Sequence, residues 1–333
     1  MIFDLIDVLP KAELHLHIEG TLEPELMLRL AKKNKITLPY NNVEQIQDAY
    51  QFYNLQSFLD LYYIGADVLR DADDFYQLMM AYFESCHDNN IVHTEIMFDP
   101  QTHTLRGIPF DSFMSGFNKA QLEAKQKYNI SSYLILCFLR HLDEQSALDT
   151  LEQSKDYLHM IKAVGLDSAE VGNPPEKFKN VFLKAKQLGL QRVAHAGEEG
   201  PAQYIWDAIK QLDVVRIDHG IRASDDPVLL QYLKDTQMPL TVCPLSNLKL
   251  KVFKTMAQHN IIKMLDAGLL VTVNSDDPSY FGGYLNENFY ALVKDLNINE
   301  TQVSDLCIKS FKASFLPQST KEKWINLIHT KQY

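Results

Sequence analysis

The sequence has few cysteines and no excess of basic residues, and each shortage excludes a class of protein. Its four cysteines, Cys86, Cys137, Cys243 and Cys307, lie far apart without paired spacing. A disulfide framework or a cysteine-based metal site is therefore not expected, and a reducing, cytoplasmic location is favoured. The formal net charge of -11 leaves no cationic surplus to neutralise phosphates, so we expect no nucleic-acid partner.

Long apolar runs are also lacking. The first residues, MIFDLIDVLPKAE, have no basic region before their apolar positions and no small-residue cleavage site, which argues against a signal peptide. No apolar run approaches the ~20 residues that a membrane-spanning helix needs. We therefore expect no membrane partner, and the sequence leaves the oligomeric state open.

Short apolar runs instead alternate with longer amphipathic segments, a pattern that predicts βαβ units and a parallel sheet. We expect strands at residues 12–18, 91–98, 131–139, 163–168, 191–196, 214–219, 239–244 and 269–275. These eight segments are the number that closes a (β/α)8 TIM-type barrel. An open doubly wound sheet is the alternative, but the first strand ends in HIEGTLEPE, which is not a glycine-rich phosphate loop.

The segments between the strands predict helices, with two additions to a simple barrel. Residues of about 40–90 are too many for one crossover, and we expect a helical insertion after strand 1 near the barrel mouth. Residues 284–331 predict extra C-terminal helices. No linker or internal repeat interrupts the chain, so residues 1–333 are expected to form a single domain. The remaining helices are expected at 111–128, 143–161, 176–188, 201–211, 225–236 and 258–267.

The first predicted strand carries two histidines on one face. Period-two alternation divides this strand into Leu14, Leu16 and Ile18 on one side and Glu13, His15, His17 and Glu19 on the other. Both faces of a parallel barrel strand are covered, so the polar face is expected to point into the barrel. Two imidazoles two residues apart can share one metal ion.

Polar side chains also follow later strands. His195 lies in RVAHAGEEG, His219 in VVRIDHG, and Asp276 and Asp277 in LLVTVNSDDP. Each of these residues stands at or just after the end of a predicted strand. Catalytic groups gather at the C-terminal ends of barrel strands, so a metal site is expected there. Imidazoles with one carboxylate suit zinc, and could also suit iron, manganese or cobalt. Glu198 lies three residues after His195 and could pass a proton to a substrate. Alternatively, its carboxylate only stabilises the N-terminus of the following helix through the helix dipole.

The ordered motifs KAELHLHIEGTLEPE, VAHAGEE, RIDHG, TVCPLSN and VNSDDP resemble the adenosine/adenine deaminase family over about residues 11 to 300. The resemblance implies a (β/α)8 barrel that holds one zinc ion per subunit and removes the amino group from a small purine. It implies that the zinc ligands are His15, His17, His195 and Asp276. It also implies that Glu198 protonates N1, that His219 lies beside the attacking water, and that Asp277 contacts the ring near N7.

Other motifs favour the adenine branch of that family. Glu19 stands where adenosine deaminases typically carry Asp, LDSAEVGNPP replaces a Gly-Asp-Glu sequence, and FDPQTHT, FLRHL and SYFGGYLNENF are branch-like. We therefore expect an adenine deaminase of purine salvage that yields hypoxanthine and ammonia. Glu19, with Glu170, is our hypothesis for the substrate-binding groups that close the sugar side. Alternatively, both glutamates only brace the loop.

Several alternatives remain open from the sequence. The chain could be an adenosine deaminase, a deaminase of N6-substituted adenines, or a catalytically dead nucleoside-binding relative. A two-metal barrel hydrolase is disfavoured because strand four, AVGLDSAEVG, offers no lysine for carboxylation. The aromatic stretch that includes Phe58, Tyr62 and Tyr63 is expected to be helix core rather than a lid. His103 and His141 follow strands, where they could approach the pocket, whereas His259 is expected to be structural.

Overall fold

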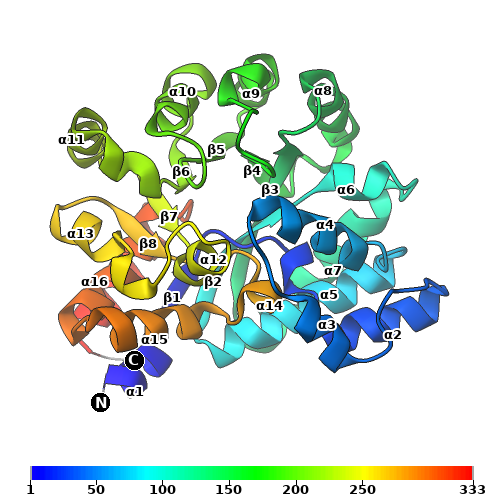
Figure 1. The fold of residues 1–333 in the computed structure, drawn as a ribbon, viewed down its shortest axis with the longest axis horizontal. Helices are drawn as coiled ribbons and strands as arrows, with labels where there is room; N and C mark the ends of the chain where they lie inside the picture. The colour runs from blue at the N-terminus through cyan, green and yellow to red at the C-terminus, as the bar shows by residue number, and fades with distance from the viewer. Residues whose placement is uncertain (1, 332–333) are drawn as a thin grey trace.

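The computed structural model describes residues 2–331 and forms a barrel of parallel strands enclosed by helices (Figure 1). Its single sheet has eight strands in the order β1-β2-β3-β4-β5-β6-β7-β8. This order is that of a (β/α)8 barrel, so the expected fold is confirmed and the open doubly wound sheet is wrong. The strands are β1 Lys11–Glu13, β2 Ile91–Phe98, β3 Ser131–Leu139, β4 Ile161–Asp167, β5 Gln191–Ala196, β6 Arg216–His219, β7 Leu240–Val242 and β8 Val271–Val273.

The first strand is shorter than predicted, because the chain beyond Glu13 is shared between two neighbours. The Ile18 amide donates to the carbonyl of Met97 in β2, and the His17 amide donates to the carbonyl of Asp276, beyond β8. Isolated parallel bridges join Leu16 to Asp276 and His17 to Met97. The seam between the first and last strands is therefore closed at the residues that carry the polar side chains.

The helical insertion after β1 is present and begins earlier than predicted. It comprises α2 Pro24–Asn34, α3 Val43–Ala49, α4 Leu55–Ala66 and α5 Ala72–Asp88. Asn54 and Asp71 start α4 and α5 with capping boxes, in which side chains satisfy the free amides of the first turn. Local sequence thus sets where these two helices begin.

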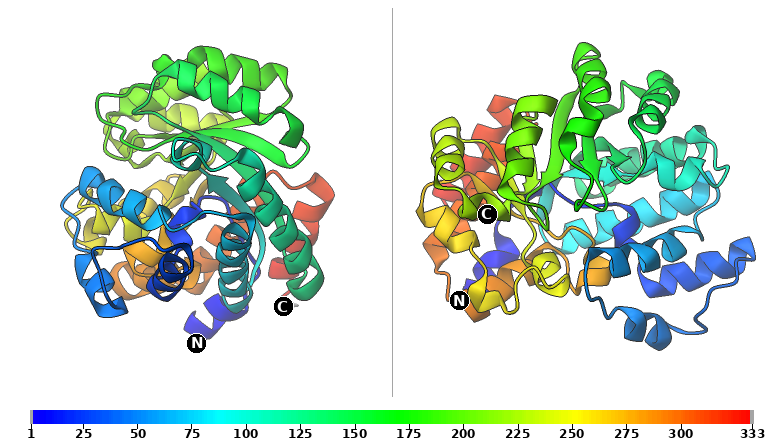
Figure 2. Two further views of the ribbon diagram at one scale, coloured as in Figure 1. Left: turned by 90° about the vertical axis from the view of Figure 1, so that its right-hand side faces the viewer. Right: turned by 45° about the horizontal axis from the view of Figure 1, so that its top comes forward.

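The other helices form the outer layer, and α15, α16 and α17 are the expected C-terminal additions (Figures 1 and 2). The predicted helix at 143–161 ends at Gln153 and continues as a 3-10 turn at Lys155–Tyr157. No helix within residues 2–331 is long and apolar enough to cross a membrane. The α-helices outside the insertion are α1 Ile2–Val8, α6 Pro100–Thr104, α7 Phe110–Tyr128, α8 Glu144–Gln153, α9 Lys179–Gln187, α10 Ala202–Leu212, α11 Pro227–Thr236, α12 Pro244–Lys249, α13 Ile261–Asp266, α14 Pro278–Phe281, α15 Leu285–Leu296, α16 Glu300–Ala313 and α17 Gln318–His329.

A buried ion pair lies inside the barrel. The guanidinium of Arg216 donates to Glu95 at 2.5 Å and to the carbonyl of Leu14 at 3.0 Å. The amide of Phe315, just beyond α16, donates to the same Glu95 carboxylate. Arg216 lowers the pKa of Glu95 against the raising effect of burial, so the pair is held charged and hydrogen-bonded.

Candidate functional site

Three imidazoles lie close together, two from the segment that follows β1 and one from β5. The Nε2 atoms of His15 and His195 lie 3.1 Å apart, and those of His17 and His195 are also 3.1 Å apart. All three side chains are buried. Burial lowers the pKa of His17 and, together with the neighbouring imidazoles, that of His195. Neutral rings of this kind present lone pairs, which is the form that binds a metal.

The opposite nitrogen of each ring faces a separate partner. His15 Nδ1 lies 3.2 Å from the Thr241 carbonyl and 3.0 Å from its hydroxyl. His17 Nδ1 lies 3.5 Å from Asp167, and His195 Nδ1 lies 3.7 Å from Asp218. The Thr241 oxygens beside His15 Nδ1 favour a proton there and leave Nε2 free to coordinate. His195 Nδ1 has no hydrogen-bond partner among the described residues.

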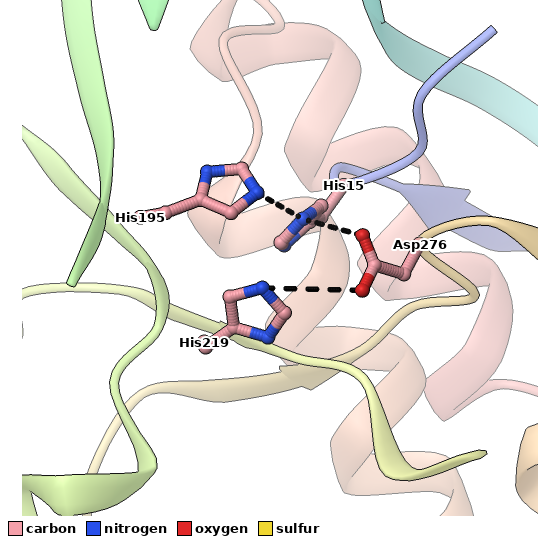
Figure 3. A group of neighbouring side chains, drawn as sticks. All are labelled: His15, His195, His219 and Asp276. Carbon is pink, nitrogen blue, oxygen red and sulfur yellow. Dashed lines mark hydrogen bonds and ion pairs between the residues drawn. The ribbon is translucent and has the colours of Figure 1, made fainter. Parts of the chain in front are cut away.

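Asp276 brings a carboxylate to this cluster, where it faces His15 and His219 (Figure 3). Its Oδ1 lies 3.2 Å from His15 Nε2 and 3.5 Å from His17 Nε2. Burial would raise the pKa of this carboxyl, but the surrounding histidines, His15 above all, lower it below its ordinary value. The carboxylate is therefore ionised and available as a ligand.

The donor set fits a divalent transition metal. Imidazole nitrogens and a carboxylate oxygen are ligands of catalytic zinc sites, and no thiolate is among the groups at this cluster. The closest cysteine sulfur, that of Cys243, lies 3.5 Å from His15 Nδ1, which is not the converging nitrogen. The residues present are therefore sufficient to hold one metal ion.

His219 and Glu198 lie beside this cluster. His219 Nε2 is 3.5 Å from Glu198 Oε2 and 3.9 Å from Asp276 Oδ2. The other oxygen of Glu198 is buried without a hydrogen-bond partner among the described residues. Burial, with the charges of Asp276 and Glu170, raises the pKa of Glu198 well above its ordinary value. This carboxyl is thus suited to carry and donate a proton near neutral pH.

Asp277 lies beside the cluster and against Gly20. A Cβ added at Gly20 would stand 1.9 Å from Asp277 Oδ1, so only glycine fits there. That oxygen is buried and has no hydrogen-bond partner within residues 2–331. Asp277 therefore presents an unused polar atom to the pocket.

Glu170 lies beneath the loop that carries Glu198. Its carboxylate accepts the backbone amides of Gly197 at 2.6 Å, Glu198 at 3.0 Å, Glu199 at 3.0 Å and Gly200 at 2.9 Å. With both oxygens engaged, Glu170 does not line the cavity. The structure thus places this predicted substrate-binding residue in the bracing position that the sequence left open.

Glu19 is likewise turned away from the cavity. It lies in a 3-10 turn at Glu19–Thr21 rather than on a strand, so strand parity does not orient its side chain. Its carboxylate accepts from His103 Nε2 at 2.7 Å and from the amide of Asp99 at 3.2 Å. Arg106 in turn donates to His103 Nδ1 at 2.9 Å. The Tyr62 hydroxyl also donates to Glu19, at 3.4 Å. Glu19 therefore contacts two residues that line the cavity, Asp99 and Tyr62.

The cavity wall contains residues that the sequence reasoning did not select. Helix α4 contributes one continuous face, and β2 and β4 contribute Asp99, Asp167 and Ser168 at their ends. The expectation that the aromatic stretch is only core is therefore incomplete, because buried side chains of α4 also line the pocket. Their i, i+3, i+4, i+7, i+8 spacing was the available signal. These residues are Leu55, Phe58, Leu59, Tyr62 and Tyr63.

Two further histidines have structural contacts. His141 Nδ1 lies 2.8 Å from the hydroxyl of Ser168, so it touches a residue of the cavity wall. His259 is buried against Asn247 and accepts the amide of Ile261, which agrees with a structural role.

Known proteins resemble this chain over nearly its full length. A family model described as adenosine deaminase matches residues 10–331. An adenine deaminase from Acinetobacter baylyi is 56% identical over 326 residues, which cover 98% of this chain and 98% of that protein. A crystal structure of adenine deaminase from Arthrobacter aurescens matches with a TM-score of 0.96 and 46% identity, covering 98% of this chain and 99% of that one. A zinc-bound amidohydrolase from Burkholderia ambifaria shares the fold, with a TM-score of 0.90 and 23% identity over 99% of this chain and 92% of that one.

Proposed function

Since the chain belongs to the adenosine deaminase family, we propose that it is a metal-dependent adenine deaminase, converting adenine to hypoxanthine and ammonia. The observation that carries this proposal is the similarity over nearly the whole chain to proteins named adenine deaminase. The buried histidine and aspartate cluster supports it, because this reaction needs an activated water. Recovery of hypoxanthine from adenine is a step of purine salvage.

We propose zinc as the metal, one ion per subunit, held by His15, His17, His195 and Asp276. The support is the convergence of three Nε2 atoms and one carboxylate oxygen on one point. A bound zinc ion supplies Lewis-acid activation of water near neutral pH. Near-stoichiometric single zinc in the purified protein is the expected result of metal analysis, and two metals per chain would contradict it.

We assign the remaining steps to side chains beside the metal ligands. Glu198 donates a proton to ring N1, which relieves the negative charge that develops on the ring as water adds to C6. His219, 3.5 Å from Glu198, orients the attacking water and accepts its proton. Asp277 contacts the ring near N7. The proton held by His219 then passes to the amino group, and ammonia leaves as the C6 hydroxyl becomes a carbonyl and returns a proton to Glu198.

Glu170 and Glu19 support this arrangement from outside the cavity. Glu170 holds the loop of Glu198 through four backbone amides, and we propose that it positions the proton donor. Glu19 holds Asp99 by its amide, so we propose that Glu19 acts on the sugar side through Asp99. We also propose that residues 1–333 act as one domain, because the eight strands form a single sheet.

An ultraviolet assay with adenine, adenosine and N6-alkyl adenines in parallel tests the function. We expect adenine to have the highest kcat/KM, because a site built around a hydrogen bond to the free base rejects an analogue that lacks it by orders of magnitude. A clear preference for adenosine would make the chain an adenosine deaminase. Turnover of none of these substrates by the zinc-loaded protein would favour a catalytically dead relative.

A further inference from the structure

Asp99 is a buried carboxyl group of the cavity wall to which the mechanism above assigns no contact with the substrate. It follows the last residue of β2 and is 3% exposed. Its Oδ2 accepts the hydroxyl of Tyr62 at 3.2 Å. Its Oδ1 is buried and has no hydrogen-bond partner within the described part of the chain. A buried acceptor without a partner is costly, so such an atom in a cavity indicates a ligand donor.

The order of strands around the barrel indicates which ligand atom faces Asp99. Glu198 follows β5 and Asp277 follows β8, with Asp167 ending β4 and Asp99 following β2 between them. Around a purine, the edge away from C6 runs from N1 through N3 and N9 to N7. With N1 at Glu198 and N7 at Asp277, a ring across the barrel mouth turns N3 toward β4 and N9 toward β2.

We propose that Asp99 is a specificity-determining residue that accepts the N9 hydrogen of free adenine, and so selects the free base over N9-substituted purines. The inference rests on the proposed function, because it takes N1 and N7 from the roles of Glu198 and Asp277. In an N9-substituted purine the ring has no hydrogen to donate there. The carboxylate would remain buried and unpaired, and the substituent would press against it.

The surrounding contacts hold Asp99 in place for this role. Its amide donates to Glu19, and its Oδ2 is occupied by Tyr62, which leaves Oδ1 for the ligand. Of the other polar groups nearby, the Ser168 hydroxyl contacts His141 at 2.8 Å. Asp167 faces His17 at 3.5 Å, and both of its carboxyl oxygens are buried without a hydrogen-bond partner among the described residues. Asp99 and Asp167 therefore both have free oxygens, and the strand order places Asp99 toward N9 and Asp167 toward N3.

Adenine and 9-methyladenine, compared in the wild type and in Asp99→Ala, provide the test. The wild type should strongly prefer adenine. The substitution should lower kcat/KM for adenine by about 10- to 100-fold, the range for a hydrogen bond to a charged group. It should not lower kcat/KM for 9-methyladenine, so the ratio between the two substrates should shrink by a similar factor. Calorimetry provides a second readout, the Kd of hypoxanthine and the Kd of 9-methylhypoxanthine. The ratio between these two Kd values should shrink in Asp99→Ala by a similar factor.

Asp99→Asn is the second variant, because it keeps the shape of the side chain if Asp99→Ala fails to fold. Its carbonyl oxygen can still accept from Tyr62, which turns the amide NH2 toward the N9 hydrogen and removes the acceptor. Asp111→Asn, an exposed position at the start of α7, is the matched control and should leave the ratio unchanged.

The outcomes separate the two proposals. A zinc-loaded wild type that does not deaminate adenine overturns the proposed function. A wild type that deaminates adenine, with folded Asp99 variants that keep the same adenine to 9-methyladenine ratio, overturns the role of Asp99 alone.

Discussion

Three residues of the site have backbone conformations that side chains rarely adopt. Ser168, His219 and Asp276 have φ values of 73°, 63° and 65°, in the left-handed region. Each of these backbone conformations costs free energy, which contacts in the surrounding structure must offset. The hydrogen bonds from His17 to the Asp276 carbonyl and from Asp276 to the His15 carbonyl provide part of it at the seam. Strain of this kind fixes side-chain direction where chemistry requires it.

Glu198→Gln tests the proton donor at the residue scale. The amide has the same shape but no acidic proton, and kcat for adenine should fall about 10²- to 10⁴-fold, the usual contribution of general acid catalysis. Zinc content should be unchanged, because the four proposed ligands are intact. Metal analysis and steady-state kinetics on the same preparation check both. Retained turnover would exclude Glu198 as the donor.

Glu170→Gln tests the positioning role. A glutamine has one acceptor oxygen and presents an NH2 group to the remaining backbone amides, so several of the four bonds to 197–200 are lost. We expect kcat to fall about 10-fold or more, with KM for adenine little changed and the pH profile of kcat altered.

Glu176→Gln, an exposed position on the nearby 3-10 turn Pro175–Phe178, is the matched control and should behave as the wild type. A KM effect without a kcat effect would instead place Glu170 among the substrate contacts.

At the scale of elements, α4 has two roles. Its buried face packs in the core and also forms one wall of the cavity. The side chain of Glu199 accepts the amide of Leu55 at 3.3 Å, which connects the start of the helix to the loop that carries Glu198. The position of this helix should therefore affect substrate binding more than the chemical step.

Asn54→Ala tests this role, because Asn54 caps α4 with a capping box. Loss of the cap should cost about 1 kcal/mol of helix stability. We expect KM for adenine to rise while kcat changes little, and amide exchange to increase in α4. Asn299→Ala removes the equivalent capping box of α16, whose residues do not line the cavity. An equal KM change in both variants would contradict a specific role for α4.

At the scale of the whole molecule, the site joins parts of the chain that are far apart in sequence. The proposed metal ligands come from the segment after β1, from β5 and from the segment after β8. A bound ion therefore links the first and last thirds of the barrel across the seam. Its binding free energy adds to the stability of the fold, because the unfolded chain has no preformed site.

Metal removal should accordingly lower the melting temperature. At a free zinc concentration 1,000 times the Kd, the stabilisation is about 4 kcal/mol, and chelation should lower Tm by several degrees. Differential scanning calorimetry with chelator, and again after zinc is restored, measures the change. His195→Ala should show little response to either treatment. A wild-type Tm that is independent of chelator would contradict a metal bound across the seam.

Much of the fold could be predicted from local sequence. The strands β2, β3 and β5 have the predicted bounds, because continuous runs of apolar and β-branched residues identify strands covered on both faces. The ordered histidine and aspartate motifs indicated the buried cluster of histidines and Asp276. The end of β1 could not be predicted, because it depends on hydrogen bonds to Met97 and Asp276, which are distant in sequence.

The sequence by itself determined the barrel, the family and the histidine and aspartate motifs whose side chains meet in the buried cluster. Periodicity and motifs indicate these features, and both depend only on residues that are close together in the sequence. Only the tertiary structure decided that Glu170 braces a loop, that Glu19 supports Asp99, and that α4 faces the cavity. The direction of such side chains is set by contacts between segments that lie tens to hundreds of residues apart in the sequence. Glu19 is an example, because it lies in a 3-10 turn, where the alternation of side chains along a strand does not apply.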